Sequence, residues 1–453
     1  MENSPYVSTT NACKLCKPLG ACLAFRGIEG AVPMLHGSQG CATYMRRYII
    51  SHFREPMDIA SSSLGEKHAV YGGGPNLKQG LKNVMTKYGA KLIGVATTCL
   101  TETIGDNVPM IVKEFCKETE WKDEREMPAL VTVSTPSYSG THMEGFHAAV
   151  RAVVEQVAGW DKPVRMLNLL PGFLSPEDLR HLREITEDFG YPTVILPDYS
   201  MTMDGPALED YEKIPQGGTP VEAIRMMGSA RATFEFGRTL DPGKSAGGLL
   251  DQRFDVPLHG MGTPIGLRET DAFFEAMEEL TGAERPEKYA LERGRLVDAL
   301  VDGHKYLFGK RAVVYGEEDL VVGLTSFLAE IGVVPVLCAS GGKSGKFASA
   351  VAAITDDILA EPPAVKEGQD FQQIEELAAE LAPDLMIGHS KGYPLARKLD
   401  IPLVRVGFPI HDRFGGQRVL HVGYRGCQSL LDRIVNAIIE RDQKNSPVGY
   451  GYM

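Results

Sequence analysis

The feature that most constrains the fold is an alternation repeated along the chain. A short apolar run leads into a glycine or small-residue turn, and a helical pattern follows. In the first third, apolar runs cover 31–36, 91–98 and 129–136, and apolar residues with a 3.6-residue period cover 142–158. Strands that alternate with helices form parallel sheets joined by crossover helices. The sequence therefore predicts an α/β protein.

The alternation falls into three blocks. A chain of 453 residues has room for about three domains of ordinary size. We predict three Rossmann-like α/β units, at 1–160, 161–310 and 311–453. Further strands are predicted at 164–170, 192–197, 231–236, 254–259, 311–315, 333–338, 384–388 and 402–407, and helices at 175–189, 270–281, 292–308, 319–331, 370–381 and 427–441. The segment 341–369 is rich in Gly, Ser, Ala and Pro, which predicts a long irregular connection.

Charge and hydropathy exclude several classes of function. The net charge of −12 argues against nucleic acid as a partner, because phosphate binding needs basic patches. No apolar run approaches the roughly 20 residues that span a bilayer. The N-terminal residues 1–5 lack a basic region followed by an apolar one, so we expect no secretory signal and a cytoplasmic location. In that reducing compartment, the eight cysteines are expected to bind metal or to be buried.

Cysteines follow two of the predicted strands. Cys41 and Cys99 each come at the end of an apolar run, where the chain is expected to enter a loop. Ligands of parallel sheets gather at the carboxyl ends of strands, and Cys16 can reach that edge from the N-terminal segment. Soft thiolates suit iron, and a cluster needs several of them. The spacing alone gives only weak support to an iron-sulfur site that contains these three sulfurs.

Other interpretations of the cysteines remain open. Cys13 and Cys16 form a Cys-x-x-Cys pair, but a structural zinc site usually needs a second close pair. A thioredoxin-like redox pair is disfavoured because no strand precedes the motif. Cys116, Cys338 and Cys427 are predicted to be core residues, and a purely structural subunit would bury all of its cysteines.

Two polar residues near these cysteines are predicted to be structural. His36 precedes the Cys41 segment, and Asp106 follows Cys99 in a turn-forming context. Neither is expected to ligate a metal or to act as a catalytic acid.

Two segments resemble the end of a nucleotide-binding loop. They are 243–245 and 342–344, each reading Gly-Lys-Ser. The complete motif has another glycine five residues before its Gly-Lys pair, where this chain has Arg238 and Leu337. We therefore predict that the chain does not hydrolyse ATP itself.

Longer motifs carry a resemblance to a known family. They are Cys16-Lys17-Pro18-Leu19-Gly20-Ala21, His36-Gly37-Ser38-Gln39-Gly40-Cys41, His52-Phe53-Arg54-Glu55-Pro56, Thr97-Thr98-Cys99-Leu100-Thr101-Glu102-Thr103-Ile104-Gly105-Asp106, Thr135-Pro136-Ser137-Tyr138, Thr263-Pro264-Ile265-Gly266, Gly388-His389-Ser390-Lys391-Gly392 and Gly407-Phe408-Pro409. With these motifs in this order, the sequence resembles the β-type subunits of the nitrogenase component 1 family.

The resemblance implies a cofactor, partners and an activity. Cys16, Cys41 and Cys99 match the β-subunit ligands of the P-cluster, an [8Fe-7S] cluster shared with the α-type subunit. Ser137 matches a serine that binds the oxidised cluster. The implied assembly is an α2β2 heterotetramer of an oxidoreductase, and a separate ATP-hydrolysing iron protein supplies its electrons. The substrate-reducing cofactor would lie in the α-type subunit, so no catalytic residue is expected here.

Three departures from the family pattern suggest a divergent branch. Only fifteen residues precede Cys16, Ser38 stands where vanadium and iron-only subunits typically have glycine, and Cys13 is an extra possible ligand. One candidate is a methylthio-alkane reductase, which releases methanethiol and a hydrocarbon from organic sulfur compounds. Another is a NifN-type scaffold for cofactor assembly, which can hold a simpler [4Fe-4S] cluster. The presence of all three cysteines together with Ser137 favours a reductase.

Overall fold

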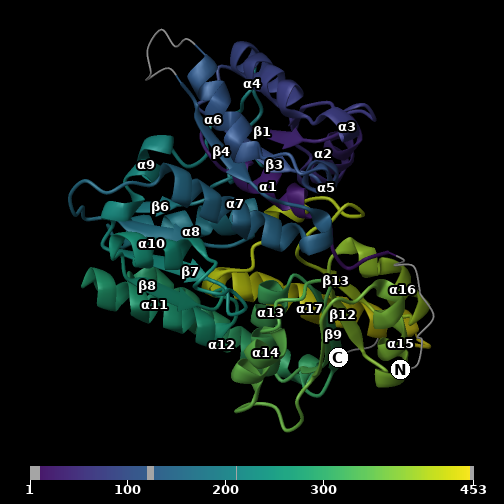
Figure 1. Cartoon of the computed structure of the whole chain (residues 1–453). Helices are drawn as coiled ribbons and strands as arrows, with labels where there is room; N and C mark the ends of the chain where they lie inside the picture. The colour runs from purple at the N-terminus through teal and green to yellow at the C-terminus, as the bar shows by residue number, and fades with distance from the viewer. Residues whose placement is uncertain (1–10, 120–126, 211, 449–453) are drawn as a thin grey trace.

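The computed structural model describes residues 11–119, 127–210 and 212–448. These residues form three parallel β-sheets flanked by helices, so the predicted α/β class is confirmed. In Figure 1 the first sheet lies at the top, the second at the middle left and the third at the bottom right. The division of the chain at 160 and 310 stays a prediction.

The first sheet has the strand order β2-β1-β3-β4. Its strands are β1 (Ala31–His36), β2 (Ala60–Ser61), β3 (Leu92–Thr97) and β4 (Ala129–Val133). Its helices are α1 (Lys17–Arg26), α2 (Gln39–Phe53), α3 (His68–Tyr71), α4 (Gly74–Tyr88), α5 (Cys99–Ile104), α6 (Val108–Glu118) and α7 (His142–Val157), and a 3-10 turn, η2, covers Ser137–Ser139. Every residue of β1 and β3 is buried, as continuous apolar runs require. From β1 the chain continues to β2 on one side of the sheet, and from β3 it continues to β4 on the other side. At such a reversal of strand order, the carboxyl ends of the two central strands border a crevice.

The second and third sheets have the same parallel arrangement. The second has the order β6-β5-β7-β8 and the third β11-β10-β9-β12-β13. Their strands are β5 (Leu167–Leu170), β6 (Thr193–Ile195), β7 (Ala232–Phe236), β8 (Leu258–Met261), β9 (Arg311–Gly316), β10 (Val334–Ser340), β11 (Ala364–Lys366), β12 (Leu385–Gly388) and β13 (Leu403–Arg405). The longer helices are α8 (Pro176–Asp188), α10 (Ala246–Phe254), α11 (Leu267–Thr281), α12 (Glu287–Leu307), α13 (Glu318–Glu330), α14 (Phe347–Thr355), α15 (Phe371–Leu381) and α17 (Gly423–Asn445). The shorter ones are α9 (Val221–Arg225), α16 (Tyr393–Lys398) and the 3-10 turns η3 (Met227–Ser229), η4 (Ser390–Gly392) and η5 (Gly416–Arg418).

Two predictions of local structure were wrong. The segment 341–369 is not irregular throughout, because it contains α14 and the edge strand β11. Alanines favour the helix, which packs against α13, while β11 is extended through its pairing with β10. The strand predicted at 254–259 is displaced, since α10 continues to Phe254 and β8 begins at Leu258.

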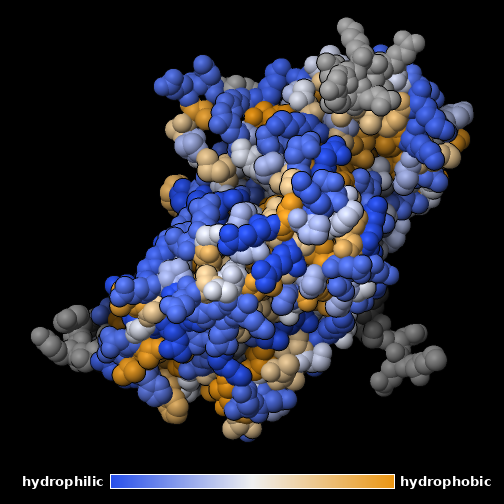
Figure 2. Space-filling view, turned by 90° about the vertical axis from the view of Figure 1, so that its left-hand side faces the viewer, coloured by the Kyte–Doolittle hydropathy of each residue, from blue (hydrophilic) through white to orange (hydrophobic). Residues whose placement is uncertain are grey.

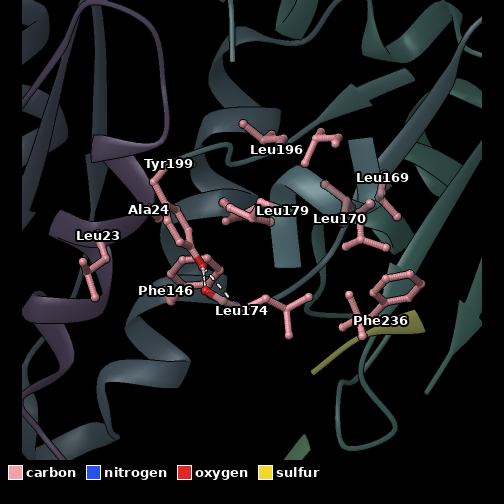
Figure 3. Packing of buried hydrophobic residues seen from close by; sticks show 14 of the residues in the cluster. Leu23, Ala24, Phe146, Leu169, Leu170, Leu174, Leu179, Leu196, Tyr199 and Phe236 are labelled. Atoms are coloured by element: carbon pink, nitrogen blue, oxygen red, sulfur yellow. Dashed lines mark hydrogen bonds between the residues drawn. The ribbon is translucent and has the colours of Figure 1, made fainter. Parts of the chain in front are cut away.

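A shared core joins the first sheet to the second. Helices α1 and α7 lie so close that a β-carbon on Gly20 would be 1.6 Å from the carbonyl oxygen of His142. Figure 3 shows the neighbouring apolar packing, in which residues of α1, α7, β5 and α8 surround Tyr199. The hydroxyl of Tyr199 donates to the carbonyl of Leu174 at 2.5 Å, so this buried polar group has a partner. The close packing of α1 and α7 fixes the start of α1, where Cys16 lies.

The surface is largely polar. On the face in Figure 2, hydrophilic residues predominate and hydrophobic residues are scattered among them. Among the residues that the structure describes, no helix combines the length and the apolar character needed to cross a membrane.

Candidate functional site

Cys41 and Cys99 lie on either side of the crevice in the first sheet. Strands β1 and β3 are hydrogen-bonded neighbours whose last residues, His36 and Thr97, are in register. Cys41 is the third residue of α2 and Cys99 is the first residue of α5. The prediction that both enter loops was wrong, because each lies in the first turn of a helix. Helix N-termini carry a positive partial charge, which suits the binding of a negatively charged group.

Cys16 reaches the same region from the N-terminal segment. It is the N-cap residue of α1, which contacts both β1 and β3. The ammonium of the next residue, Lys17, donates to the Ser139 hydroxyl at 3.0 Å. Burial, followed by negative charge on Cys16, raises the pKa of Tyr44, which lies one turn after Cys41 on α2. The structure therefore places Cys16 near both α2 and η2.

Ser137 and Ser38 contact two of the three sulfurs. The backbone N–H of Ser137 donates to Cys99 Sγ at 3.2 Å, and the hydroxyl of Ser38 donates to Cys41 Sγ at 3.7 Å. Cys99 is exposed, and Cys16 and Cys41 are partly exposed. Three accessible sulfurs and one serine, all predicted from the sequence, thus lie along one edge of the first sheet.

The remaining cysteines have different surroundings. Burial raises the pKa of Cys338 and of Cys427 to about 12, and each packs in the main core. Cys116 is partly exposed, and burial raises its pKa less strongly. Within the described residues, no three or more His, Cys, Asp or Glu side chains are grouped to hold a single metal ion.

Cys13 is buried against residues of the third sheet. Its side chain is 3% exposed, and its Sγ lies 3.7 Å from His389 Nε2. Burial raises the pKa of Cys13 to about 12, so the thiol is neutral. A buried neutral thiol is a poor competitor for a metal.

His36 and Asp106 form a buried support beneath the cysteine segment. His36 Nδ1 lies 2.9 Å from the Ser62 hydroxyl, and its Nε2 lies 3.0 Å from Asp106 Oδ2. Asp106 also accepts the Gly73 N–H at 2.9 Å. Burial lowers the pKa of His36, which favours neutral imidazole. Both side chains are held by protein groups, in agreement with a structural role.

A cavity of about 760 Å³ lies next to the site. It is lined by both Gly-Lys-Ser segments, and it borders Cys13, Lys17 and Glu317. Ser245 of the first such segment is the N-cap of α10 and accepts the Gly248 N–H at 3.0 Å, so this segment begins an ordinary helix.

Comparison with known proteins decides the family. The family model "Nitrogenase component 1 type Oxidoreductase" matches residues 16–439. The chain belongs to the nitrogenase component 1 type oxidoreductase family. The match begins at Cys16 and covers all three sheets.

Members of this family are similar over nearly the whole chain. A nitrogenase molybdenum-iron protein beta chain of Clostridium pasteurianum is 34% identical over 439 residues, which cover 96% of this chain and 94% of that protein. A nitrogenase vanadium-iron protein beta chain of Trichormus variabilis is 36% identical over 436 residues, which cover 93% of this chain and 92% of that protein. The solved structure titled "Nitrogenase Cp1 at pH 6.5" has a TM-score of 0.95 and 32% sequence identity to this chain. The match covers 100% of this chain and 98% of the chain in that structure. The recognition of a β-type member of an oxidoreductase family is therefore confirmed.

Proposed function

We propose that this chain is the β-type subunit of a nitrogenase-like reductase that works in the cytoplasm. It would carry half of an [8Fe-7S] P-cluster at the interface with an α-type subunit, within an α2β2 heterotetramer. The observation that carries the proposal is the position of Cys16, Cys41 and Cys99 at the starts of three helices, of which α2 and α5 follow the neighbouring strands β1 and β3 and α1 contacts both strands.

The residues present suit such a cluster. The three thiols provide the soft sulfur ligands that iron favours. The three cysteines are exposed or partly exposed, so ligands from a second chain can reach a cluster bound there. A site for a single metal ion would instead take all of its ligands from this chain. Ser137, whose N–H already contacts Cys99 Sγ, is placed to add an oxygen ligand. The bound cluster would supply one-electron steps, and Cys16, Cys41 and Cys99 would hold and orient it.

We infer that ATP hydrolysis, electron relay and substrate reduction take place in different subunits of the complex. A P-cluster subunit receives electrons from an ATP-hydrolysing iron protein and passes them to a cofactor in the α-type subunit. This agrees with the incomplete nucleotide motifs at 243–245 and 342–344. The alternative is a NifN-type scaffold with a [4Fe-4S] cluster, and the four retained residues favour the reductase.

Iron counting and EPR test the proposal on the complex purified anaerobically with its α-type partner. We expect about eight irons per αβ pair at this interface and a two-electron oxidation, since iron content follows cluster type. About four irons with a simple S = 1/2 signal would establish the scaffold instead.

Matched cysteine variants test the ligands. Cys99→Ala is expected to lose most of the interface iron, whereas Cys338→Ala, which removes a buried core thiol, should keep it. Equal iron in both variants would refute the ligand assignment.

Substrate is decided by turnover. The molybdenum-iron and vanadium-iron beta chains are similar to this chain to nearly the same degree, so identity alone does not separate the substrate classes. Reduction of methylated sulfides without reduction of dinitrogen would establish a methylthio-alkane reductase, and the reverse result would establish a nitrogenase.

A further inference from the structure

The segment before Cys16 lies across the third sheet. We call residues 11–15 the strap. The third sheet turns to opposite sides after β9 and β12, and the crevice between such strands is where α/β sheets usually bind ligands. Here the chain's own strap lies over that edge, because Ala12 bridges Asp370 and the Phe371 N–H donates to the Asn11 carbonyl at 3.3 Å.

Lys391, in η4 directly after β12, fastens the middle of the strap. Its ammonium donates to the carbonyl of Ala12 at 2.8 Å and to that of Lys14 at 3.3 Å, so it binds the backbone on both sides of Cys13. The Asn11 amide donates back to the Lys391 carbonyl at 3.3 Å. Hydrogen bonds from a charged donor are stronger than neutral ones, and partial burial excludes competing water.

Cys13, between the two carbonyls that Lys391 binds, packs against His389 and Gly341. Its thiol lies against His389, and a β-carbon on Gly341 would come within 2.3 Å of the Cys13 carbonyl oxygen. This close contact holds the strap against the end of β10. The strap then passes to α7, where the Leu15 N–H donates to His142 Nδ1 at 3.3 Å and the His142 N–H donates to the Leu15 carbonyl at 3.0 Å.

Hydrogen bonding places Lys391 near Cys16, one of the proposed cluster ligands. Burial lowers the pKa of Lys391. The Lys14 carbonyl that Lys391 contacts is two residues before Cys16, so the two residues lie close together although they come from opposite ends of the chain.

We propose that Lys391 is a positioning residue that holds the strap, and so Cys16, in place from the third sheet. The part of this proposal that concerns the cluster rests on the proposed function. The proposal predicts that Lys391, in the third sheet's loop, affects both the rate of iron release from the cluster and the reduction potential of the cluster. Loss of a cation beside a thiolate destabilises the more negative, reduced form, so the reduction potential should fall.

The test compares Lys391→Met with Lys391→Arg and with Lys14→Met. Lys14 lies in the strap itself, but its exposed ammonium makes no hydrogen bond or ion pair within the described residues, so Lys14→Met is the matched control for charge. The first measurement is the alkylation rate of Cys13 in the native complex, followed by peptide mass spectrometry. Cys13 is buried in the wild type and is not among the proposed ligands, so it reports on the strap whether or not a cluster is present.

Lys391→Met should speed Cys13 alkylation on the order of tenfold or more, because it removes two charge-assisted hydrogen bonds. Iron release to a chelator should also speed up, on the order of tenfold, as is typical when a residue supporting a ligand is lost. The cluster potential should become more negative. Lys391→Arg should restore much of each property, and Lys14→Met should leave the alkylation rate unchanged.

An unchanged Cys13 rate in Lys391→Met, or an equal increase in Lys14→Met, would overturn the proposal. If Lys391→Met does not fold, Asn11→Ala removes only the outer contact and must still speed alkylation by a smaller factor. A wild-type complex without an eight-iron cluster would refute the proposed function, while the Cys13 result would still decide the strap.

Discussion

In the first sheet, β1 and β3 end beside Cys41 and Cys99, whereas in the third sheet β9 and β12 end beside Glu317 and His389. Both positions are the crevice at which the strand order reverses. The first keeps its thiols accessible, with hydrogen-bond donors directed at the sulfurs. The third is covered by the strap, and its thiol, Cys13, is buried beside His389.

The difference indicates that burial, more than residue type or sheet geometry, separates a proposed ligand from a buried cysteine. Cys13 and Cys16 are three residues apart, yet one is 3% exposed beneath the strap and the other is partly exposed at the start of α1. Removing a thiol from water disfavours its charged form, which metals require. The covered crevice thus serves as an anchor for the accessible one.

The largest expected effect comes from separating α1 from α7. A β-carbon in Gly20→Ala would lie 1.6 Å from the His142 carbonyl oxygen, so two buried helices would have to move apart. We expect the free energy of unfolding to fall by about 3 kcal/mol or more, measured by chemical denaturation. Because α1 carries Cys16, interface iron should fall as well.

Gly294→Ala is the control for this substitution. Gly294 is an exposed position of α12, and a β-carbon there would meet nothing within 4 Å. Helix propensity should raise stability by about 0.5–1 kcal/mol. Equal stability of the Gly20 variant and the wild type would show that α1 does not depend on this close contact.

The main strands could be predicted because burial on both faces leaves a continuous apolar run. The run at 31–36 is the strand β1 itself. The strand β11 could not be predicted in this way. Two of its residues are only partly buried, Lys366 is exposed, and the strand is extended because it pairs in register with β10. Local sequence carries little information on such a partner-dependent strand.

For the site, the strand ends predicted that Cys41 and Cys99 would be close, and β1 and β3 are neighbours. The anchoring of Cys16 could not be predicted, because Lys391 and the carbonyl it binds on Ala12 are 379 residues apart in sequence. The burial of Cys13 likewise depends on His389, which is 376 residues away. A short motif cannot indicate which distant loop covers it.

A medium effect is expected from the acids at the covered crevice. Burial raises the pKa of Glu318 to about 7, even though the Ser344 N–H donates to its carboxylate at 3.2 Å. A carboxyl whose folded pKa is raised stabilises the fold below its unfolded pKa, and that contribution is lost as the pH rises through the folded value. Between about pH 4.5 and 7, the wild type should therefore lose roughly 2 kcal/mol relative to Glu318→Gln.

Urea denaturation at several pH values measures this difference. Burial also raises the pKa of Glu330 to about 7, so only the wild-type minus Glu318→Gln difference isolates Glu318. Parallel stability curves for the two proteins across this range would show that the covered crevice is open enough to solvate the carboxylate.

The smallest effect is expected at the accessible crevice, from Ser38→Gly. Ser38 is the N-cap of α2, yet its hydroxyl makes no capping hydrogen bond and instead donates to Cys41 Sγ at 3.7 Å. Stability should fall by only a few tenths of a kcal/mol, measured by urea denaturation, while the EPR spectrum of the oxidised complex changes. Thr98→Gly is the matched control at the N-cap of α5, because the buried Thr98 hydroxyl donates to the His36 carbonyl at 3.0 Å and the loss of that hydrogen bond should cost about 1 kcal/mol. Equal losses in the two variants would mean that Ser38 serves the helix, and a spectrum unchanged by Ser38→Gly would mean that its hydroxyl does not act on the sulfur.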